Sequence, residues 1–176
     1  MSKYQLKWGI LATGGIAEAF ARDLSANPET RGVKDIEHKV VASASSTSAD
    51  RAKEFNKKVY APDDAKAYGS YKELVEDPNV DIIYVATPHS HHYQNTMLCL
   101  EAGKNVLCEK AFTVNAKQTD ALIKKAKEKN LFLMEAVSDR PSFCAPIPLT
   151  EDRSGLGTSP SQFTSARLSR PASSET

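Results

Sequence analysis

The residues with the clearest chemical potential in this sequence are a neighbouring glutamate and lysine, Glu109 and Lys110. They follow the apolar run 105–108, which is typical of a buried strand. A lysine at the carboxyl end of a sheet strand can polarise a substrate hydroxyl, or its pKa can shift enough for it to join a proton transfer. The alternative interpretation of Glu109 and Lys110 is a salt-bridged pair on the surface.

A second stretch with chemical potential is the histidine-rich segment 87–92, which reads Thr-Pro-His-Ser-His-His. It follows the apolar run 81–86, and α/β proteins bind ligands at the carboxyl ends of such strands. His89, His91 and His92 suggest a metal ion. However, they lie too close in sequence to face one ion without an unusual turn, and no nearby carboxylate or thiolate completes the ligand set. We therefore expect no metal and expect this segment to cover a cofactor, with an exposed helix-capping loop as the alternative.

A glycine turn near the N-terminus is suited to the phosphates of such a cofactor. The apolar run 6–12 ends before Gly14 and Gly15, and apolar residues at helical spacing follow from residue 16. In a strand–turn–helix unit, glycines let backbone N–H groups approach a pyrophosphate, and the helix points its positive end at that charge. The spacing Ala12-x-Gly14-x-x-Ala17 matches the dinucleotide fingerprint, with alanine in place of its first glycine. A glycine turn without a ligand is the alternative.

The residues after the apolar run 39–44 indicate which dinucleotide would bind. An acidic residue at this point would hold the ribose of NAD, and none is present. Ser45, Ser46 and Thr47 supply hydroxyl groups instead, and Arg51 follows one turn into the next helix. Because phosphate is bound by hydrogen-bond donors and positive charge, this set favours NADP over NAD. The alternative for Arg51 is a solvated charge on the helix surface.

These segments are connected by strands and helices that alternate along residues 1–137. We expect Thr47 to be an N-cap, Ser70 and Glu73 to form a capping box, and Asn115 to open a long helix. Gly103 is expected to end a helix in the left-handed conformation. The alternation predicts an α/β fold, a Rossmann-type doubly wound parallel sheet with strand order 3-2-1-4-5-6. Strands are expected at residues 6–12, 39–44, 67–68, 81–86, 105–108 and 131–136, and helices at 16–25, 49–57, 70–77, 93–101 and 115–130.

Length and composition set further limits. A chain of 176 residues with 40% hydrophobic content suits one core, with or without a tail. The net charge of +1 and the absence of a Lys/Arg block leave no electrostatic footprint for nucleic acid. Cys99, Cys108 and Cys144 show no metal-binding spacing, and because Cys99 and Cys108 lie in apolar segments, buried free thiols are expected rather than disulfides or ligands. With no secretory signal and no apolar stretch of about 20 residues, we expect a cytoplasmic protein without a membrane partner.

The character of the chain changes at residue 138. Residues 138–176 contain nine serines and five prolines, and their scattered apolar residues show neither a helical nor a strand period. Because this composition cannot bury enough apolar surface to offset the entropy of ordering, we expect a disordered tail. A regulated, serine-rich interaction tail is the functional alternative.

Together these motifs resemble the Gfo/Idh/MocA oxidoreductase family. The resemblance rests on GILATGGIA at residues 9–17, DIIYVATPHSHH at 81–92 and EAGKNVLCEKAF at 101–112, and it covers residues 5–137. It is closest to the branch of NADP-dependent D-xylose 1-dehydrogenase and trans-1,2-dihydrobenzene-1,2-diol dehydrogenase. It implies an NADP-dependent oxidoreductase that moves hydride from a sugar or diol CH–OH to NADP, with Lys110 as the catalytic residue. The expected cofactor-binding residues are Ala12, Thr13, Gly14, Gly15, Ile16, Ser45, Ser46, Arg51, Thr87, Pro88, His89, His92, Glu109 and Lys110.

Two departures from the family pattern affect these expectations. Ala111 stands where the family has proline, so the peptide bond before it is expected either to be trans or to be held cis by its surroundings. After Val137 the resemblance is lost, and our hypothesis for residues 138–176 is a shifted reading frame or an unspliced intron. We then expect the family's substrate domain and homo-oligomer face to be missing. The alternative function is therefore a truncated nucleotide-binding module without turnover, whose exposed apolar surface promotes association.

Overall fold

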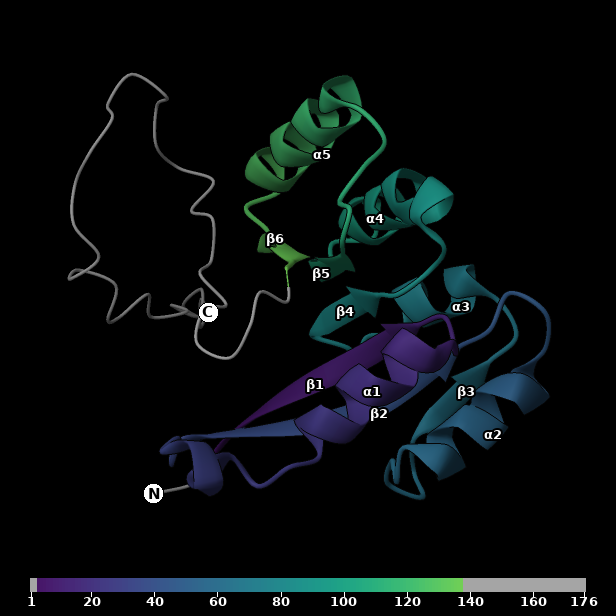
Figure 1. The fold of residues 1–176 in the computed structure, drawn as a ribbon, viewed down its shortest axis with the longest axis vertical. Coiled ribbons are helices and arrows are strands. Elements are labelled where there is room, and N and C mark those ends of the chain that lie inside the picture. Colours follow the sequence, from purple (N-terminus) through teal and green to yellow (C-terminus); the bar gives the residue numbers. More distant parts are fainter. Residues whose placement is uncertain (1–2, 138–176) are drawn as a thin grey trace, which may run out of the picture.

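A six-stranded parallel sheet runs through residues 3–137, the part of the chain that the computed structural model describes (Figure 1). Its order is β3-β2-β1-β4-β5-β6, which confirms the predicted doubly wound topology. This order places the carboxyl ends of β1 and β4 side by side where the winding direction reverses. The strands are β1 (Tyr4–Leu11), β2 (Ile36–Ala44), β3 (Lys66–Tyr68), β4 (Ile82–Val85), β5 (Asn105–Glu109) and β6 (Leu133–Ala136).

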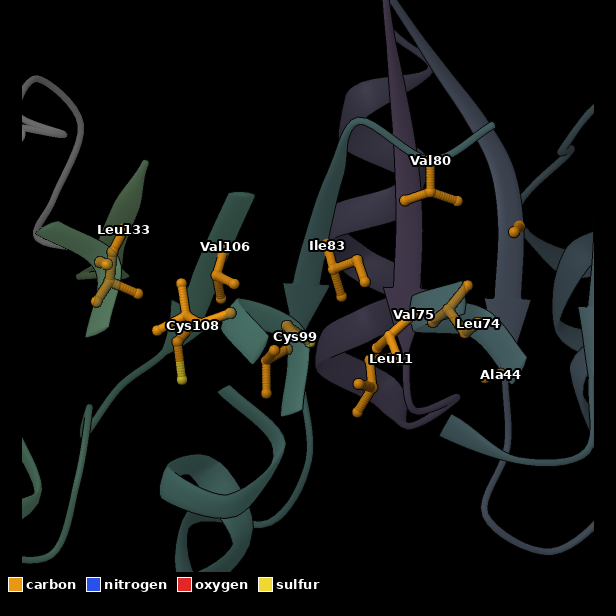
Figure 2. Packing of buried hydrophobic residues seen from close by; sticks show 14 of the residues in the cluster. Leu11, Ala44, Leu74, Val75, Val80, Ile83, Cys99, Val106, Cys108 and Leu133 are labelled. Atoms are coloured by element: carbon orange, nitrogen blue, oxygen red, sulfur yellow. The ribbon is translucent and has the colours of Figure 1, made fainter. Parts of the chain in front are cut away.

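Helices cover both faces of the sheet, because successive residues of a strand point to opposite sides. On one face, Ile10 and Tyr84 pack with apolar residues of α1 and α2. On the other, Leu11 and Ile83 pack with those of α3, α4 and α5 (Figure 2). All four side chains are at most 1% exposed, so the strands read as continuous apolar runs. The helices are α1 (Gly15–Leu24), α2 (Ala49–Lys58), α3 (Tyr71–Glu76), α4 (His92–Glu101) and α5 (Ala116–Glu128).

Three predicted helix ends are confirmed. Ser70 and Glu73 form the capping box that starts α3, each accepting a hydrogen bond from the other's backbone N–H. At α5, the Asn115 side chain accepts a hydrogen bond from the N–H of Gln118. Gly103 follows α4 with φ at +77°, the left-handed conformation that glycine adopts at lowest cost.

The predicted cap of α2 is wrong by one residue. Ser48, not Thr47, is the N-cap, and its Oγ accepts a hydrogen bond from the N–H of Arg51 at 3.3 Å. Ser48 lies directly before the first helical residue, Ala49, and has the extended backbone that an N-cap needs. The Thr47 hydroxyl is therefore available for other contacts.

Several element boundaries also differ from the prediction. Tyr4 and Ile36 are register partners, so β1 and β2 both begin earlier than expected. Their first residues are polar or partly exposed, and backbone pairing continues there without an apolar pattern. Other differences include the start of β6 at Leu133, the start of α4 at His92, and 3-10 helices at Pro28–Arg31 and His89–His91, and most remaining boundaries differ by one or two residues.

The two described cysteines, Cys99 and Cys108, are free and buried, as predicted. Burial raises the pKa of the Cys108 thiol to about 12 and also raises that of Cys99. Cys144 and the prediction of a disordered tail at residues 138–176 lie outside the described residues. Within residues 3–137, no helix has the length and hydropathy that a membrane span requires. The cytoplasmic location stays a prediction.

An apolar groove of about 540 Å³ lies beside α1 on one face of the sheet. Phe20 of α1 and Tyr84 of β4, which both line it, stack with ring centroids 3.8 Å apart. Ile16, Phe132 and Val137 also line the groove, and each is more than 40% exposed. Association of copies through such apolar surface stays a prediction.

Candidate active site

The predicted site segments all lie along the edge of the sheet where its strands end. The N–H of Ala12 donates to the carbonyl of Ala44 at 3.1 Å, and the N–H of Ala86 donates to that of Leu11 at 3.0 Å. The segment after β1 therefore lies between those after β2 and β4, and β5 next to β4 adds Lys110. This is the switch point at which doubly wound sheets bind ligands.

The glycine turn after β1 is open to an approaching ligand. Gly14 is the N-cap of α1, and its carbonyl accepts the N–H of Glu18 at 3.0 Å. A side-chain Cβ added at Gly14 or Gly15 would meet no atom within 4 Å. Thr13 is half-buried and Ile16 is exposed at the sides of this turn. The free space and the positive end of α1 together fit a pyrophosphate.

Ala12 shows why the dinucleotide fingerprint has glycine at its first position. Its φ is +90°, in the left-handed region that disfavours residues with a Cβ. Alanine, the smallest of those residues, adopts this conformation here while 9% exposed. The chain thus makes the turn with alanine in the first glycine's place.

Hydroxyl groups and a guanidinium gather between β2 and α2. The N–H of Ser45 donates to the carbonyl of Tyr68 at 3.1 Å, which fixes the start of this loop. The hydroxyls of Ser45 and Thr47 are 3.0 Å apart, and Nη1 of Arg51 donates to Thr47 Oγ1 at 3.4 Å. Ser46 is exposed beside them. Donors and positive charge in this arrangement suit a phosphate group.

The segment after β4 is held by side chains of α4. The Oγ1 of Thr87 accepts a hydrogen bond from Asn95 Nδ2 at 3.2 Å. The imidazole of His92 is 1% exposed, and its Nε2 lies 2.9 Å from the carbonyl oxygen of Thr87. Its Nδ1 lies 2.8 Å from the carbonyl oxygen of Ala111. His92 therefore connects the loop after β4 to the turn after β5 through its ring nitrogens.

The other histidines lie on an exposed 3-10 helix that follows Pro88. The His91 Nδ1 is 3.0 Å from Ser90 Oγ, and the His89 ring meets the His92 ring edge-on at 5.7 Å between centroids. Across residues 3–137, no group of three His, Cys, Asp or Glu side chains is arranged to hold a metal ion. The His92 ring nitrogens are instead directed at two backbone carbonyls.

Lys110 is presented on an exposed turn after β5 whose backbone contacts several side chains. The N–H of Lys110 donates to Glu109 Oε2 at 3.1 Å. The N–H of Phe112 donates to Glu135 Oε1 at 2.7 Å. The peptide bond between Lys110 and Ala111 is cis, which decides between the two expected geometries.

Two residues at this edge of the sheet, Tyr84 and Glu135, were not predicted from the sequence. The Tyr84 hydroxyl donates a hydrogen bond to Glu109 Oε1, and burial together with this bond raises the pKa of the tyrosine. Glu135 lies in β6, beside Cys108 of β5. The signal that could have found them was a polar group at an otherwise apolar position: a tyrosine in the run 81–86 and a glutamate in the run 131–136.

Comparison with known proteins identifies the family. The family described as "Oxidoreductase family, NAD-binding Rossmann fold" (GFO_IDH_MocA) matches residues 6–137. The chain belongs to this family. The D-xylose 1-dehydrogenase (NADP(+)) of Hypocrea jecorina is 66% identical over 137 residues, which are 78% of this chain and 35% of the relative. The trans-1,2-dihydrobenzene-1,2-diol dehydrogenase of Mus musculus is 46% identical over 135 residues, which are 77% of this chain and 38% of the relative.

Solved structures of other oxidoreductases share the fold. KijD10, a 3-ketoreductase from Actinomadura kijaniata in complex with NADP, has a TM-score of 0.64 and 32% identity, over 74% of this chain and 38% of that chain. An NAD binding oxidoreductase from Klebsiella pneumoniae has a TM-score of 0.68 and 29% identity, over 75% and 34%. The predicted family and branch are confirmed. The chain spans just over a third of the length of these relatives.

Proposed function

We propose that this chain binds NADP(H) at the carboxyl edge of its sheet and serves hydride transfer between the nicotinamide and a CH–OH carbon of a sugar or diol. One observation carries the proposal. The open glycine turn lies beside a cluster of Ser45, Thr47 and Arg51, where NAD-binding sheets usually place an acidic residue. The NADP named for the relative in Hypocrea jecorina and for KijD10 supports the same cofactor.

In this proposal the residues divide along the length of the dinucleotide. Backbone N–H groups at Gly14 and Gly15 receive the pyrophosphate, and Arg51 with its neighbouring hydroxyls receives the 2′-phosphate. Thr87 and Lys110, which follow β4 and β5, are then left for the nicotinamide and substrate. The remaining predicted cofactor contacts stay predictions: Ala12, Thr13, Ile16, Ser46, Pro88, His89, His92 and Glu109.

The proposed chemistry gives Lys110 one task. When bound, NADP would supply the hydride acceptor for the substrate carbon, whose CH–OH group would become a carbonyl on losing its hydroxyl proton. Lys110 polarises the hydroxyl and helps remove that proton. Its side chain is exposed, as a group that meets an incoming substrate must be. D-xylose, the substrate named for the relative that is 66% identical, is the first sugar to test.

A second candidate function is dinucleotide binding without turnover. It is favoured by the location of the glycine turn and the Arg51 cluster, which both lie at the carboxyl edge of the described sheet. Hydride transfer needs both reactants held in a near-attack geometry and shielded from water. The glycine turn and the Arg51 cluster, by contrast, require only the carboxyl edge of this sheet to bind a dinucleotide.

Two measurements on the purified chain test these functions. A titration with NADPH, followed by nicotinamide fluorescence, is compared with the same titration by NADH. We expect saturable binding that prefers NADPH, and binding of neither would refute the proposal. NADPH formation from NADP and D-xylose then separates the candidates. Turnover that depends on D-xylose supports the dehydrogenase, and binding with no turnover supports the binding module.

A further inference from the structure

We propose that Glu135 is a positioning residue, which holds the backbone turn that presents Lys110. The inference rests on the proposed function, in which this turn meets the nicotinamide end of the cofactor. Glu135 lies on β6, and within residues 3–137 it forms no hydrogen bond with the glycine turn or the Arg51 cluster. Its effect on the site therefore passes through the turn.

The turn is held at three consecutive residues by side chains from three different elements. Each contact is made to a backbone group, so together they fix the path of the chain rather than the pose of one side chain. The contacts are Glu109 Oε2 to the N–H of Lys110 (3.1 Å), His92 Nδ1 to the carbonyl of Ala111 (2.8 Å), and Glu135 Oε1 to the N–H of Phe112 (2.7 Å).

Glu135 makes the shortest of these contacts, and it comes from the strand next to the turn. In the register of β5 and β6, Glu135 lies beside Cys108 and Ala136 lies beside Glu109. The carboxylate thus reaches forward along the sheet to the N–H of Phe112. A hydrogen bond from an amide to a carboxylate is charge-assisted and stronger than one to a neutral acceptor.

No cation of the described part of the chain competes for this carboxylate. Within residues 3–137, Glu135 takes part in no ion pair, and its hydrogen bond goes to the N–H of Phe112. A partly buried carboxylate without a cationic partner is costly to desolvate. The hydrogen bond from the Phe112 N–H offsets part of that cost, so we assign the carboxylate to the turn rather than to a surface ion pair.

Lys110 depends on its backbone for its position. In the described part of the chain, its ammonium group forms neither a hydrogen bond nor an ion pair. The placement of Nζ therefore follows from the course of the turn between Glu109 and Phe112. Release of the Phe112 N–H would widen the range of positions that Nζ samples.

The test compares two ligands that share the adenosine end but differ at the nicotinamide end. NADPH spans the whole site, whereas adenosine 2′,5′-bisphosphate carries only the adenosine and the 2′-phosphate. For Glu135→Ala we expect NADPH affinity to fall about tenfold, the change that loss of one charge-assisted hydrogen bond produces, with unchanged affinity for the bisphosphate. A general loss of structure would weaken both ligands alike.

Three further variants make the result specific. Glu135→Gln keeps an acceptor oxygen, so we expect its NADPH affinity to stay within about threefold of the wild type. Glu76→Ala removes a glutamate that is 60% exposed on α3, and should change neither affinity. If Glu135→Ala does not fold, Glu135→Asp serves instead, since it keeps the charge but shortens the side chain by one methylene.

The outcomes separate this inference from the proposed function. Wild-type binding of NADPH that Glu135→Ala leaves unchanged would overturn the positioning role alone. Equal loss of NADPH and bisphosphate binding would also overturn it. If the wild-type chain binds neither ligand, the proposed function fails and the positioning role fails with it.

Discussion

The Arg51→Ala variant tests the choice of cofactor most directly. Nη1 of Arg51 lies 3.4 Å from Thr47 Oγ1, close to a hydroxyl pair that a 2′-phosphate can join. The guanidinium is exposed, so its contact with the phosphate is partly screened by water and salt. Hydrogen bonds to charged groups contribute about 1.5–3 kcal/mol, and we take the lower end for an exposed pair, which is roughly a tenfold loss of NADPH affinity.

The informative result is whether Arg51→Ala lowers the affinity for NADPH more than the affinity for NADH. NADH has no 2′-phosphate, so its affinity should stay within about twofold in Arg51→Ala. The loss of NADPH affinity should also shrink as the salt concentration rises, because screening weakens the wild-type contact. Titrations of both nucleotides at low and high salt, followed by nicotinamide fluorescence, measure these effects.

Lys53→Ala is the matched control for Arg51→Ala. Lys53 lies on the same helix and pairs with Asp50 at 3.4 Å, but it forms no hydrogen bond with Ser45, Thr47 or Arg51. We expect it to leave NADPH affinity unchanged. If Arg51→Ala weakens NADPH and NADH equally, or weakens neither, then the Ser45–Thr47–Arg51 cluster is not the site of the 2′-phosphate.

The structure supports three further predictions. A Cβ at Gly9 would lie 2.9 Å from Val80 Cγ1, so Gly9→Ala should lower the free energy of unfolding by about 1–3 kcal/mol. Chemical denaturation measures this change, and an unchanged denaturation midpoint would contradict the close packing of Gly9 against Val80. Burial raises the pKa of Asp77, but hydrogen bonds from a backbone N–H and a tyrosine outweigh it and lower the pKa below its ordinary 3.8. The ionised carboxylate therefore stabilises the fold above pH 3.8, and this stability is lost as the pH falls through the lower pKa that Asp77 has in the folded chain. Asp77→Asn should lower the free energy of unfolding at neutral pH, and the difference between variant and wild type should disappear in acid, as denaturation at several pH values would measure. Finally, Cys99 and Cys108 should resist thiol reagents until denaturant is added, because burial raises the pKa of both thiols. Rapid labelling of Cys99 or Cys108 in the native chain, measured by mass spectrometry of their proteolytic fragments, would count against their burial.

The fold was predictable because its signals are local. The run 81–86 is apolar on both sides of the strand, and β4 is buried on both faces as that pattern requires. The Ser70 capping box and the left-handed Gly103 mark helix ends through contacts within a few residues. The early parts of β1 and β2 were missed because pairing of Tyr4 with Ile36 joins residues far apart in sequence and leaves no apolar run.

The candidate site was predictable only where its residues act through their own types. Gly14 and Arg51 could be predicted as candidate site residues because a bare turn and a cation near hydroxyls suggest phosphate without any knowledge of neighbours. Tyr84 and Glu135 were missed because their roles depend on partners in other strands and turns, Glu109 and Phe112. No residue spacing in the sequence predicts the contact between residues 112 and 135.

The two ends of the site consequently differ in what their geometry requires. The glycine turn depends on β1 and α1, which adjoin it in sequence and lie at the centre of the sheet. The Lys110 turn depends on α4 through His92 and on β6 through Glu135. Among the described strands, β6 is at the edge and pairs only with β5, and edge elements open at lower free energy than central ones. Under the proposed function, local opening of β6 would therefore displace Lys110 and leave the proposed pyrophosphate site at the glycine turn in place, so dinucleotide binding would persist without a correctly placed lysine.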